Sequence, residues 1–206
     1  MGSTMKYSDL DLGTIEAIMN KLGGMDGAKR FLRGELVISE LVQNGVINLG
    51  FVTSDGATGQ DWIERLEKKG IRSSDYAKSI LLSSDFNPSK AGTVTKIAVL
   101  KGELFPDENR VTKNIRAEAD KRKLVKPSAE VACLIREKFT DKEIENMGLR
   151  WIVAMHDPIQ DSDGDLHLLG ANRYDDGSWL RTFYDYSGFR WGREVGFAFA
   201  VPQFDS

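Results

Sequence analysis

The sequence predicts an α+β fold in which N-terminal helices, a small hairpin and two further helices precede a helix-covered, mainly antiparallel sheet. Two observations lead to this prediction. Apolar residues recur at three- and four-residue spacing in several segments, which is typical of amphipathic helices. From residue 149 onward the chain instead holds consecutive strand-like segments separated by short turns. Strands joined in this way pair antiparallel, which argues against a doubly wound parallel sheet.

The first predicted elements are two helices and a hairpin. Helical periodicity covers residues 12–22 and 28–33, and glycines end both segments. Strands are predicted at 35–40 and 46–52. Asn44-Gly45 lies between these strands, and both residues tolerate the positive φ that a two-residue turn requires.

A stretch of turn-forming residues predicts a division of the chain into two parts. Helices are expected at 59–69 and 74–82, the first with Thr58 as its N-cap. The following residues are rich in Ser, Asp, Asn, Pro and Gly, which favour turns over regular structure. We therefore predict a linker at 85–92 between an N-terminal module, 5–84, and a C-terminal domain, 93–206. The first four residues look like a vector remnant and are left out of the fold.

The C-terminal domain is predicted to combine three helices with a sheet. Its predicted helices are 106–124, 128–139 and a short one after Thr140, where Thr140 and Glu143 form a capping-box pattern. Its predicted strands are 93–100, 149–156, 166–170, 178–185 and 195–201. The segment 149–155 is apolar on both faces, which is typical of a central strand covered by helices.

Composition limits the classes of function. A chain of 206 residues fits one large domain or two small ones. The net charge of −3 gives no overall basic field for nucleic acid or an anionic membrane. No apolar run has the length of a membrane span, and the N-terminus lacks the layout of a secretory signal. We expect a cytoplasmic protein without a membrane partner, whose single cysteine, Cys133, is buried and unreactive.

Stretches spread over most of the chain resemble a group of uncharacterised bacterial proteins. They are Lys21–Gly24 with Lys29–Leu36, Thr58–Glu67, Asn114–Asp120, Met155–Ile159 with Asp163-Gly164, and Gly196–Phe199. The resemblance implies a bacterial protein. It implies no activity, ligand or catalytic residue.

One candidate site is the segment 156–167, which holds four aspartates and both histidines of the chain. Carboxylates and imidazoles that meet at a strand end can hold Mg²⁺, Mn²⁺ or Ca²⁺. One hypothesis is therefore a metal-dependent phosphoester hydrolase that binds a divalent cation and uses His156 as its general base. Its metal ligands would be Asp157, Asp161, Asp163 and Asp165.

The same segment also fits a β-turn between two strands. An EF-hand loop needs glycine at its sixth position and glutamate at its twelfth, but counted from Asp161 these positions hold Leu166 and Asn172. Aspartate bonds its own backbone in turns, and Gly164 accepts positive φ. We weigh the turn above the metal site.

A second candidate is the basic segment 110–126, for which two interpretations stand. Its basic residues are Arg110, Lys113, Arg116, Lys121, Arg122, Lys123 and Lys126. A basic helix face can contact phosphates and release counterions, so nucleic-acid binding through this helix is an alternative function. Charge runs on amphipathic helices are more often solvated faces, and the net charge gives no supporting field. Nucleic acid is therefore disfavoured as a partner.

The third candidate is the aromatic C-terminal segment. Trp179, Arg181 and Phe183 alternate along a predicted strand and share one face of it. Three further side chains follow closely, Arg190, Trp191 and Arg193. Trp, Tyr and Arg are the side chains that dominate binding hot spots, although aromatic residues are also good core and strand formers.

Of the three candidates, the third is favoured: a binding or interaction module whose aromatic and arginine-bearing face contacts a protein or small-molecule partner. The hydrolase and the nucleic-acid binder stay as alternatives. No serine or cysteine stands in a recognisable nucleophile setting, so the sequence leaves open whether the protein is an enzyme.

Overall fold

The structure is a computed structural model, and it describes residues 42–43, 45–161, 163–174 and 176–202 together with scattered positions between 11 and 32. The chain divides into two units, Met1–Glu40 and Leu41–Ser206. The helices predicted at 12–22 and 28–33 fall largely outside the described residues, and the strand predicted at 35–40 falls wholly outside them. All that follows concerns the second unit.

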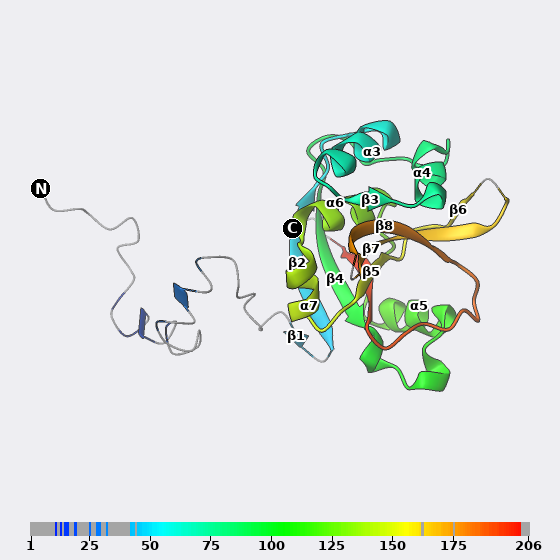
Figure 1. Cartoon of the computed structure of the whole chain (residues 1–206). Coiled ribbons are helices and arrows are strands. Elements are labelled where there is room, and N and C mark those ends of the chain that lie inside the picture. The colour runs from blue at the N-terminus through cyan, green and yellow to red at the C-terminus, as the bar shows by residue number, and fades with distance from the viewer. Residues whose placement is uncertain are drawn as a thin grey trace, which may run out of the picture. The chain divides into compact units, whose positions relative to one another are not determined.

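The second unit is built on one nine-stranded sheet, whose strands follow the order β1-β2-β4-β9-β5-β7-β8-β3, with β6 paired to β7. The strands are β1 (Val42–Gln43), β2 (Val46–Thr53), β3 (Arg72–Ser73), β4 (Val94–Lys101), β5 (Trp151–Ala154), β6 (Ile159–Gln160), β7 (Leu166–Tyr174), β8 (Gly177–Tyr184) and β9 (Val195–Val201). Figure 1 shows the sheet between two groups of helices. This is the α+β architecture that the sequence predicts.

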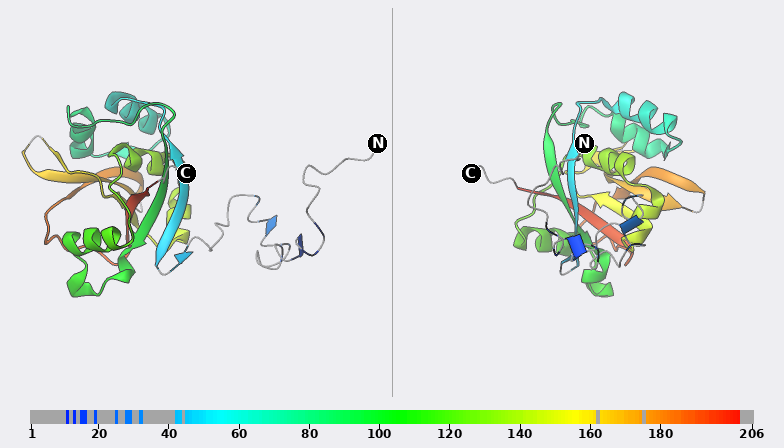
Figure 2. Two further views of the ribbon diagram at one scale, coloured as in Figure 1. Left: turned by 180° about the vertical axis from the view of Figure 1, so that it is seen from behind. Right: turned by 90° about the vertical axis from the view of Figure 1, so that its left-hand side faces the viewer.

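Antiparallel pairs dominate the sheet, as predicted. Among the strands that the structure describes, only β5 with β9 and β3 with β8 run parallel. The turn between β1 and β2 contains Gly45, whose φ of 73° lies in the left-handed region that the Asn-Gly pattern predicts. The neighbours β2 and β4 run side by side along one border of the sheet (Figure 2).

Each face of the sheet has its own core because consecutive strand residues point to opposite sides. On one face, Ala198 and Leu169 pack with buried residues of α3 (Gly59–Lys68), α4 (Asp75–Leu82), α6 (Glu130–Lys138) and α7 (Asp141–Asn146). On the other face, Phe197 and Phe199 pack with Ile115 and Ala119 of α5 (Thr112–Lys121). We call these the helix-rich face and the α5 face.

Local signals set the ends of several helices. The capping boxes of Thr58 with Asp61 and of Thr140 with Glu143 open α3 and α7 as predicted. The helix predicted at 106–124 is instead interrupted. A 3₁₀ turn at Asp107–Asn109 precedes α5, because the buried Arg110 side chain bonds the carbonyl oxygens of Gly102 and Phe105 and holds the chain in a turn.

The segment predicted as a linker, 85–92, lies between two strands of the same sheet. Seven residue pairs join β2 to β4 across this segment, so the sheet is continuous from one predicted part to the other. Phe86 is buried in the core of the helix-rich face. The boundary between the two units of the chain falls earlier, between Glu40 and Leu41.

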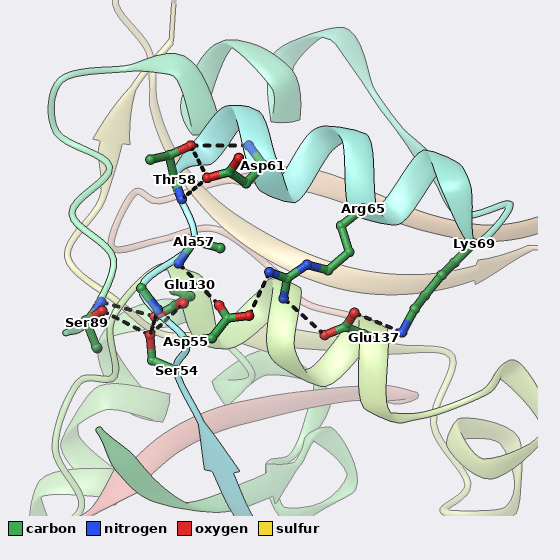
Figure 3. A network of polar contacts seen from close by, with 11 residues as sticks. Ser54, Asp55, Ala57, Thr58, Asp61, Arg65, Lys69, Ser89, Glu130 and Glu137 are labelled. Atoms are coloured by element: carbon green, nitrogen blue, oxygen red, sulfur yellow. Dashed lines mark hydrogen bonds and ion pairs between the residues drawn. The ribbon is translucent and has the colours of Figure 1, made fainter. Parts of the chain in front are cut away.

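A buried carboxylate anchors this segment. Glu130, at the start of α6, is fully buried and lies 2.8 Å from the Ser54 hydroxyl after β2. Its other oxygen accepts from the backbone N–H of Ser89 at 3.0 Å. The carbonyl oxygen of Ser89 lies 2.9 Å from the same hydroxyl, whose single proton is shared between the two acceptors. Three segments that are distant in sequence therefore meet at one point, which we call the Glu130 node (Figure 3).

A second, more exposed network surrounds the node. Arg65 of α3 pairs with Asp55 at 2.7 Å and with Glu137 of α6 at 3.6 Å, and Lys69 pairs with Glu137 at 2.8 Å. The Arg65 guanidinium, through its hydrogen bond, holds the pKa of Asp55 below its usual value. These ion pairs connect α3 to α6, but their solvent exposure limits what each contributes to stability.

We predict that Glu130→Ala lowers the free energy of unfolding by about 2 kcal/mol, because the half-buried Ser89 N–H loses its acceptor and the Ser54 hydroxyl keeps only the Ser89 carbonyl oxygen. Glu137→Ala on the same helix is the matched control. It removes only partly exposed ion pairs, so its expected loss is below about 1 kcal/mol. Urea denaturation followed by circular dichroism measures both. Equal losses in the two variants would contradict a special role of the node.

Candidate functional site

The hairpin of β7 and β8 places a set of aromatic and polar side chains on the α5 face. In its register Asn172 is paired with Trp179, and Gly170 with Arg181. On the other side of β7, Trp151 of β5 is also paired with Asn172. Paired residues point to the same side of a sheet. We call the resulting surface the aromatic–arginine face; it comprises Trp151, Asn172, Tyr174, Trp179, Arg181 and Phe183, with Arg72 and Arg150 at its edges.

The rings of this face are held in contact with one another and with the core. Phe183 lies 5.5 Å from Trp151 and 5.5 Å from Trp191 between ring centroids. Space for Phe183 comes from Gly170, where an added Cβ would lie 2.7 Å from Phe183 Cε2. The ring position therefore depends on the missing side chain of one glycine. Aromatic pairs at such distances pack favourably beyond the area they bury.

Three arginines lie against these rings. The Arg181 guanidinium is 4.9 Å from the Tyr174 centroid and 5.0 Å from that of Trp179. The Arg150 guanidinium lies 5.4 Å from the centroid of the same Tyr174 ring. The Arg72 guanidinium lies 4.5 Å from the Trp179 ring centroid. Arg72 also pairs with Asp176 at 3.2 Å. Within the described part of the chain, neither Arg150 nor Arg181 forms an ion pair with a carboxylate.

Several buried polar atoms of the face have no hydrogen-bond partner among the described residues. They are both amide atoms of Asn172, Nε1 of Trp151 and Nε of Arg181. Asn172 is fully buried. Leaving a polar group buried and unpaired costs about 1–3 kcal/mol, and native proteins seldom accept this cost without a use for the group.

A hollow of about 300 Å³ opens beside Trp151. Its lining residues are Arg150, Trp151, Gly192, Arg193, Glu194 and Val195. Two guanidinium groups and an indole therefore border space large enough for part of a small molecule. Arg193 and Glu194 are both exposed at its rim.

The structure separates the six residues that the sequence places in one binding set. Trp179, Arg181 and Phe183 share a face as predicted, and Arg193 lines the neighbouring hollow. Trp191 is buried at 5% exposure, and its indole N–H donates to Thr112 Oγ1 at 3.0 Å. It is therefore a core residue. Arg190 is exposed, and its backbone forms a bridge to Val111.

Both ring nitrogens of His156 form hydrogen bonds to backbone groups. Its Nε2 accepts from the N–H of Leu169 at 2.9 Å, and its Nδ1 lies 2.5 Å from the carbonyl oxygen of Asp157. These contacts fix the tautomer that carries its proton on Nδ1. Burial, the largest influence, lowers the pKa of His156 to about 4. A ring with both nitrogens bonded has no free lone pair for a substrate proton, which argues against the general-base role.

The four aspartates named as metal ligands lie in different settings. Asp157 pairs with Lys126 instead of joining the loop. Asp161 accepts from the N–H groups of Asp163 and Asp165 at 2.9 and 3.0 Å, and from His167 Nε2 at 2.7 Å. Burial alone would raise the pKa of Asp161, but these donors lower it below its usual value. The Asp161 carboxylate therefore organises the turn.

Three side chains of this loop do come close to one another. Ligand atoms of Asp161, Asp165 and His167 lie within 4.8 Å of one another. Carboxylate and imidazole donors suit several divalent cations. Both oxygens of Asp161 are already engaged with the turn and with His167, so the cluster supports the β-turn interpretation at least as well as a metal site.

The basic segment 110–126 is largely neutralised within the protein. Arg110 is buried, as described above, and Arg116 pairs with Asp185 at 2.8 Å. Arg122 pairs with Glu118 at 2.8 Å on α5 itself. Because most of its charges have partners, the segment does not present a continuous basic stripe to phosphates. Cys133 is fully buried, and burial raises the pKa of its thiol, as expected for an unreactive cysteine.

Comparison with protein-family models, curated proteins and solved structures gave no match. The candidate site therefore stands on its geometry alone. In the described part of the chain, none of the helices combines the length and apolar content needed to cross a bilayer.

Sequence reasoning did not find several members of the aromatic–arginine face. Asn172 lies beyond the end of the strand predicted at 166–170, and the apolar pattern around Trp151 predicts only a buried strand. The available signal was a lone polar residue after the apolar run Leu168–Ala171. An asparagine in such a place is unusual in a central strand, because a buried amide needs partners.

We predict a specific acid sensitivity from His156. Its folded pKa of about 4 lies below the ordinary value of 6.5, so the unfolded chain takes up the proton first as the pH falls. The contribution of His156 to the free energy of unfolding is therefore fully present above pH 6.5. It falls by roughly 3 kcal/mol as the pH drops from 6.5 to 4. His156→Gln should show a smaller drop in free energy of unfolding between pH 7 and pH 4.5 than the unchanged protein. An equal drop in both proteins would exclude this histidine as the cause.

Proposed function

We propose that the protein is a ligand-binding module whose site is the aromatic–arginine face together with the hollow beside Trp151. The observation that carries the proposal is the buried Asn172 amide, whose donor and acceptor both lack a partner among the described residues. A ligand that reaches this amide would satisfy both atoms at once. Such polar groups, few and fixed among apolar walls, are typical of small-molecule sites.

The chemistry of the face indicates the kind of ligand. Trp151, Tyr174 and Trp179 offer ring surfaces for stacking against a flat group. Arg150 and Arg181 offer positive charge without a carboxylate partner in the described chain, and guanidinium groups bind carboxylates and phosphates in a two-point geometry. The proposed ligand is therefore an anion that carries a planar ring, which is the chemistry of a nucleotide.

Asn172→Leu separates this proposal from a purely structural role for the amide. Leucine has a similar size and removes two unpaired polar atoms, so we predict that the variant gains about 1–2 kcal/mol in free energy of unfolding. Thr112→Val is the matched control, because Thr112 is equally buried but accepts a hydrogen bond from Trp191. That variant should lose about 1 kcal/mol. Urea denaturation at pH 7 measures both, and a destabilised Asn172→Leu would remove the main support for the proposal.

Calorimetry tests the ligand directly. We predict that one or more of the four common nucleoside 5′-monophosphates binds the full chain. The matching nucleoside, which lacks the phosphate, and inorganic phosphate, which lacks the ring, should each bind at least about tenfold more weakly. Asn172→Leu and Arg150→Gln should weaken binding, whereas Lys113→Gln, a change at an exposed lysine of α5, should not. Absence of heat with all four nucleotides would exclude this ligand class.

A further inference from the structure

A row of rings that includes three exposed tyrosines lies at the end of the same hairpin. Tyr76 of α4 stacks on His167 of β7 with 6.0 Å between ring centroids, and His167 lies 4.6 Å from Tyr184 of β8. Tyr186 follows at 6.2 Å from Tyr184. We call these four residues the tyrosine row. Its His167 and Tyr184 are paired with each other and point to the side of the hairpin opposite to the aromatic–arginine face.

The tyrosines of the row are half open to solvent, whereas its histidine is buried. Tyr76, Tyr184 and Tyr186 are 47%, 46% and 58% exposed. His167 is fixed by Asp161 at 2.7 Å, and Phe189 holds Tyr186 edge to face at 5.3 Å. The rings are therefore kept in place by contacts beneath them while their outer faces stay uncovered.

A hollow of about 530 Å³ lies at the end of this row. It is lined by Gly164, Asp165, Leu166, Tyr184, Asp185 and Tyr186. Two ring surfaces, one apolar side chain and two carboxylates therefore border the same space, and none of the lining residues is basic. Leu166 is 44% exposed at its rim.

The charge around the hollow is negative. Asp163 accepts from the Tyr76 hydroxyl at 3.1 Å, and this hydrogen bond, followed by the charge of Asp163, raises the pKa of Tyr76. Asp165 is exposed and has no ion pair among the described residues. Asp185 is engaged by Arg116 at 2.8 Å. Ring faces and a carboxylate together form the usual setting for an organic cation.

The adjacent strand edge indicates where such a cation would come from. On its outer edge β8 is paired only at Trp179 and Leu180, by the two-residue strand β3. From Arg181 to Tyr184 this edge has no strand partner within the described residues. An extended protein segment can add to an open edge through its backbone and place alternate side chains on one face of the sheet.

We propose that the tyrosine row and its hollow bind an extended, basic segment of a partner protein, with a lysine or arginine side chain of that segment between Tyr184, Tyr186 and Asp165. The guanidinium or ammonium group lies against the ring faces and the Asp165 carboxylate. The aliphatic stem of the side chain packs on Leu166. The partner's backbone pairs with β8 beyond Leu180.

A blocked heptapeptide that alternates threonine with arginine is the probe, with a citrulline-for-arginine version as its uncharged match. Binding of the labelled peptides to the full chain is measured by fluorescence polarisation at low and at physiological salt. We expect the arginine peptide to bind, the citrulline peptide to bind at least about tenfold more weakly, and added salt to weaken the first alone. Equal binding of the two peptides overturns the proposal, as does no binding of the arginine peptide at low salt.

Surface variants locate the site. Tyr186→Leu and Asp165→Asn should each weaken the arginine peptide about three- to fivefold, since each removes one contact to the cation from an exposed position. Phe51→Leu and Asp120→Asn are matched controls, because Phe51 lies on β2 and Asp120 on α5 and both are exposed. An effect of the controls equal to that of the site variants overturns the proposal. So does free arginine amide binding as tightly as the peptide, because the ligand would then be a small cation.

Discussion

The buried carboxylate of Glu130 is the contact on which the arrangement of sheet and helices depends. It joins the turn after β2, the segment before β4 and the first turn of α6. The part of the chain that forms α3 and α4 begins after the first of these places and ends before the second, and α6 begins at the third. Charged groups are seldom fully buried unless hydrogen bonds satisfy them, and here two donors from distant segments do so. The surrounding ion pairs of Arg65 reinforce the same junction from the solvent side.

The β7–β8 hairpin gives the protein two surfaces of opposite charge. On the α5 face, Arg150 and Arg181 lie on the Tyr174 ring without carboxylate partners in the described chain. On the helix-rich face, Asp163 and Asp165 border the tyrosine row. Because a strand sends alternate residues to opposite sides, a single hairpin separates the arginine-bearing face from the aspartate-bearing tyrosine row. The two proposed partners would therefore not compete for the same side chains.

Local signals in the sequence predicted the elements well and the assembly less well. The capping patterns at Thr58 and Thr140 and the positive φ of Gly45 depend on neighbouring residues only, and the structure follows these predictions. Glu130 anchors the segment 85–92 from about 40 positions away from Ser89, and no local pattern in the sequence predicts such a contact. The aromatic–arginine face was half predicted, from the alternation of Trp179, Arg181 and Phe183. Asn172 and Trp151 come from other strands, and only the register brings them together.

The position of β9 has a consequence for how the protein forms. This strand is the last of the sheet in chain order, yet it lies between β4 and β5 in the middle of the sheet. It is buried along almost its whole length, and it pairs antiparallel to one neighbour and parallel to the other. During synthesis, the edges of β4 and β5 that pair with β9 therefore stay unpaired until residue 201 has left the ribosome. The nascent chain is most exposed to wrong strand partners in the interval between the synthesis of β5 and the synthesis of β9.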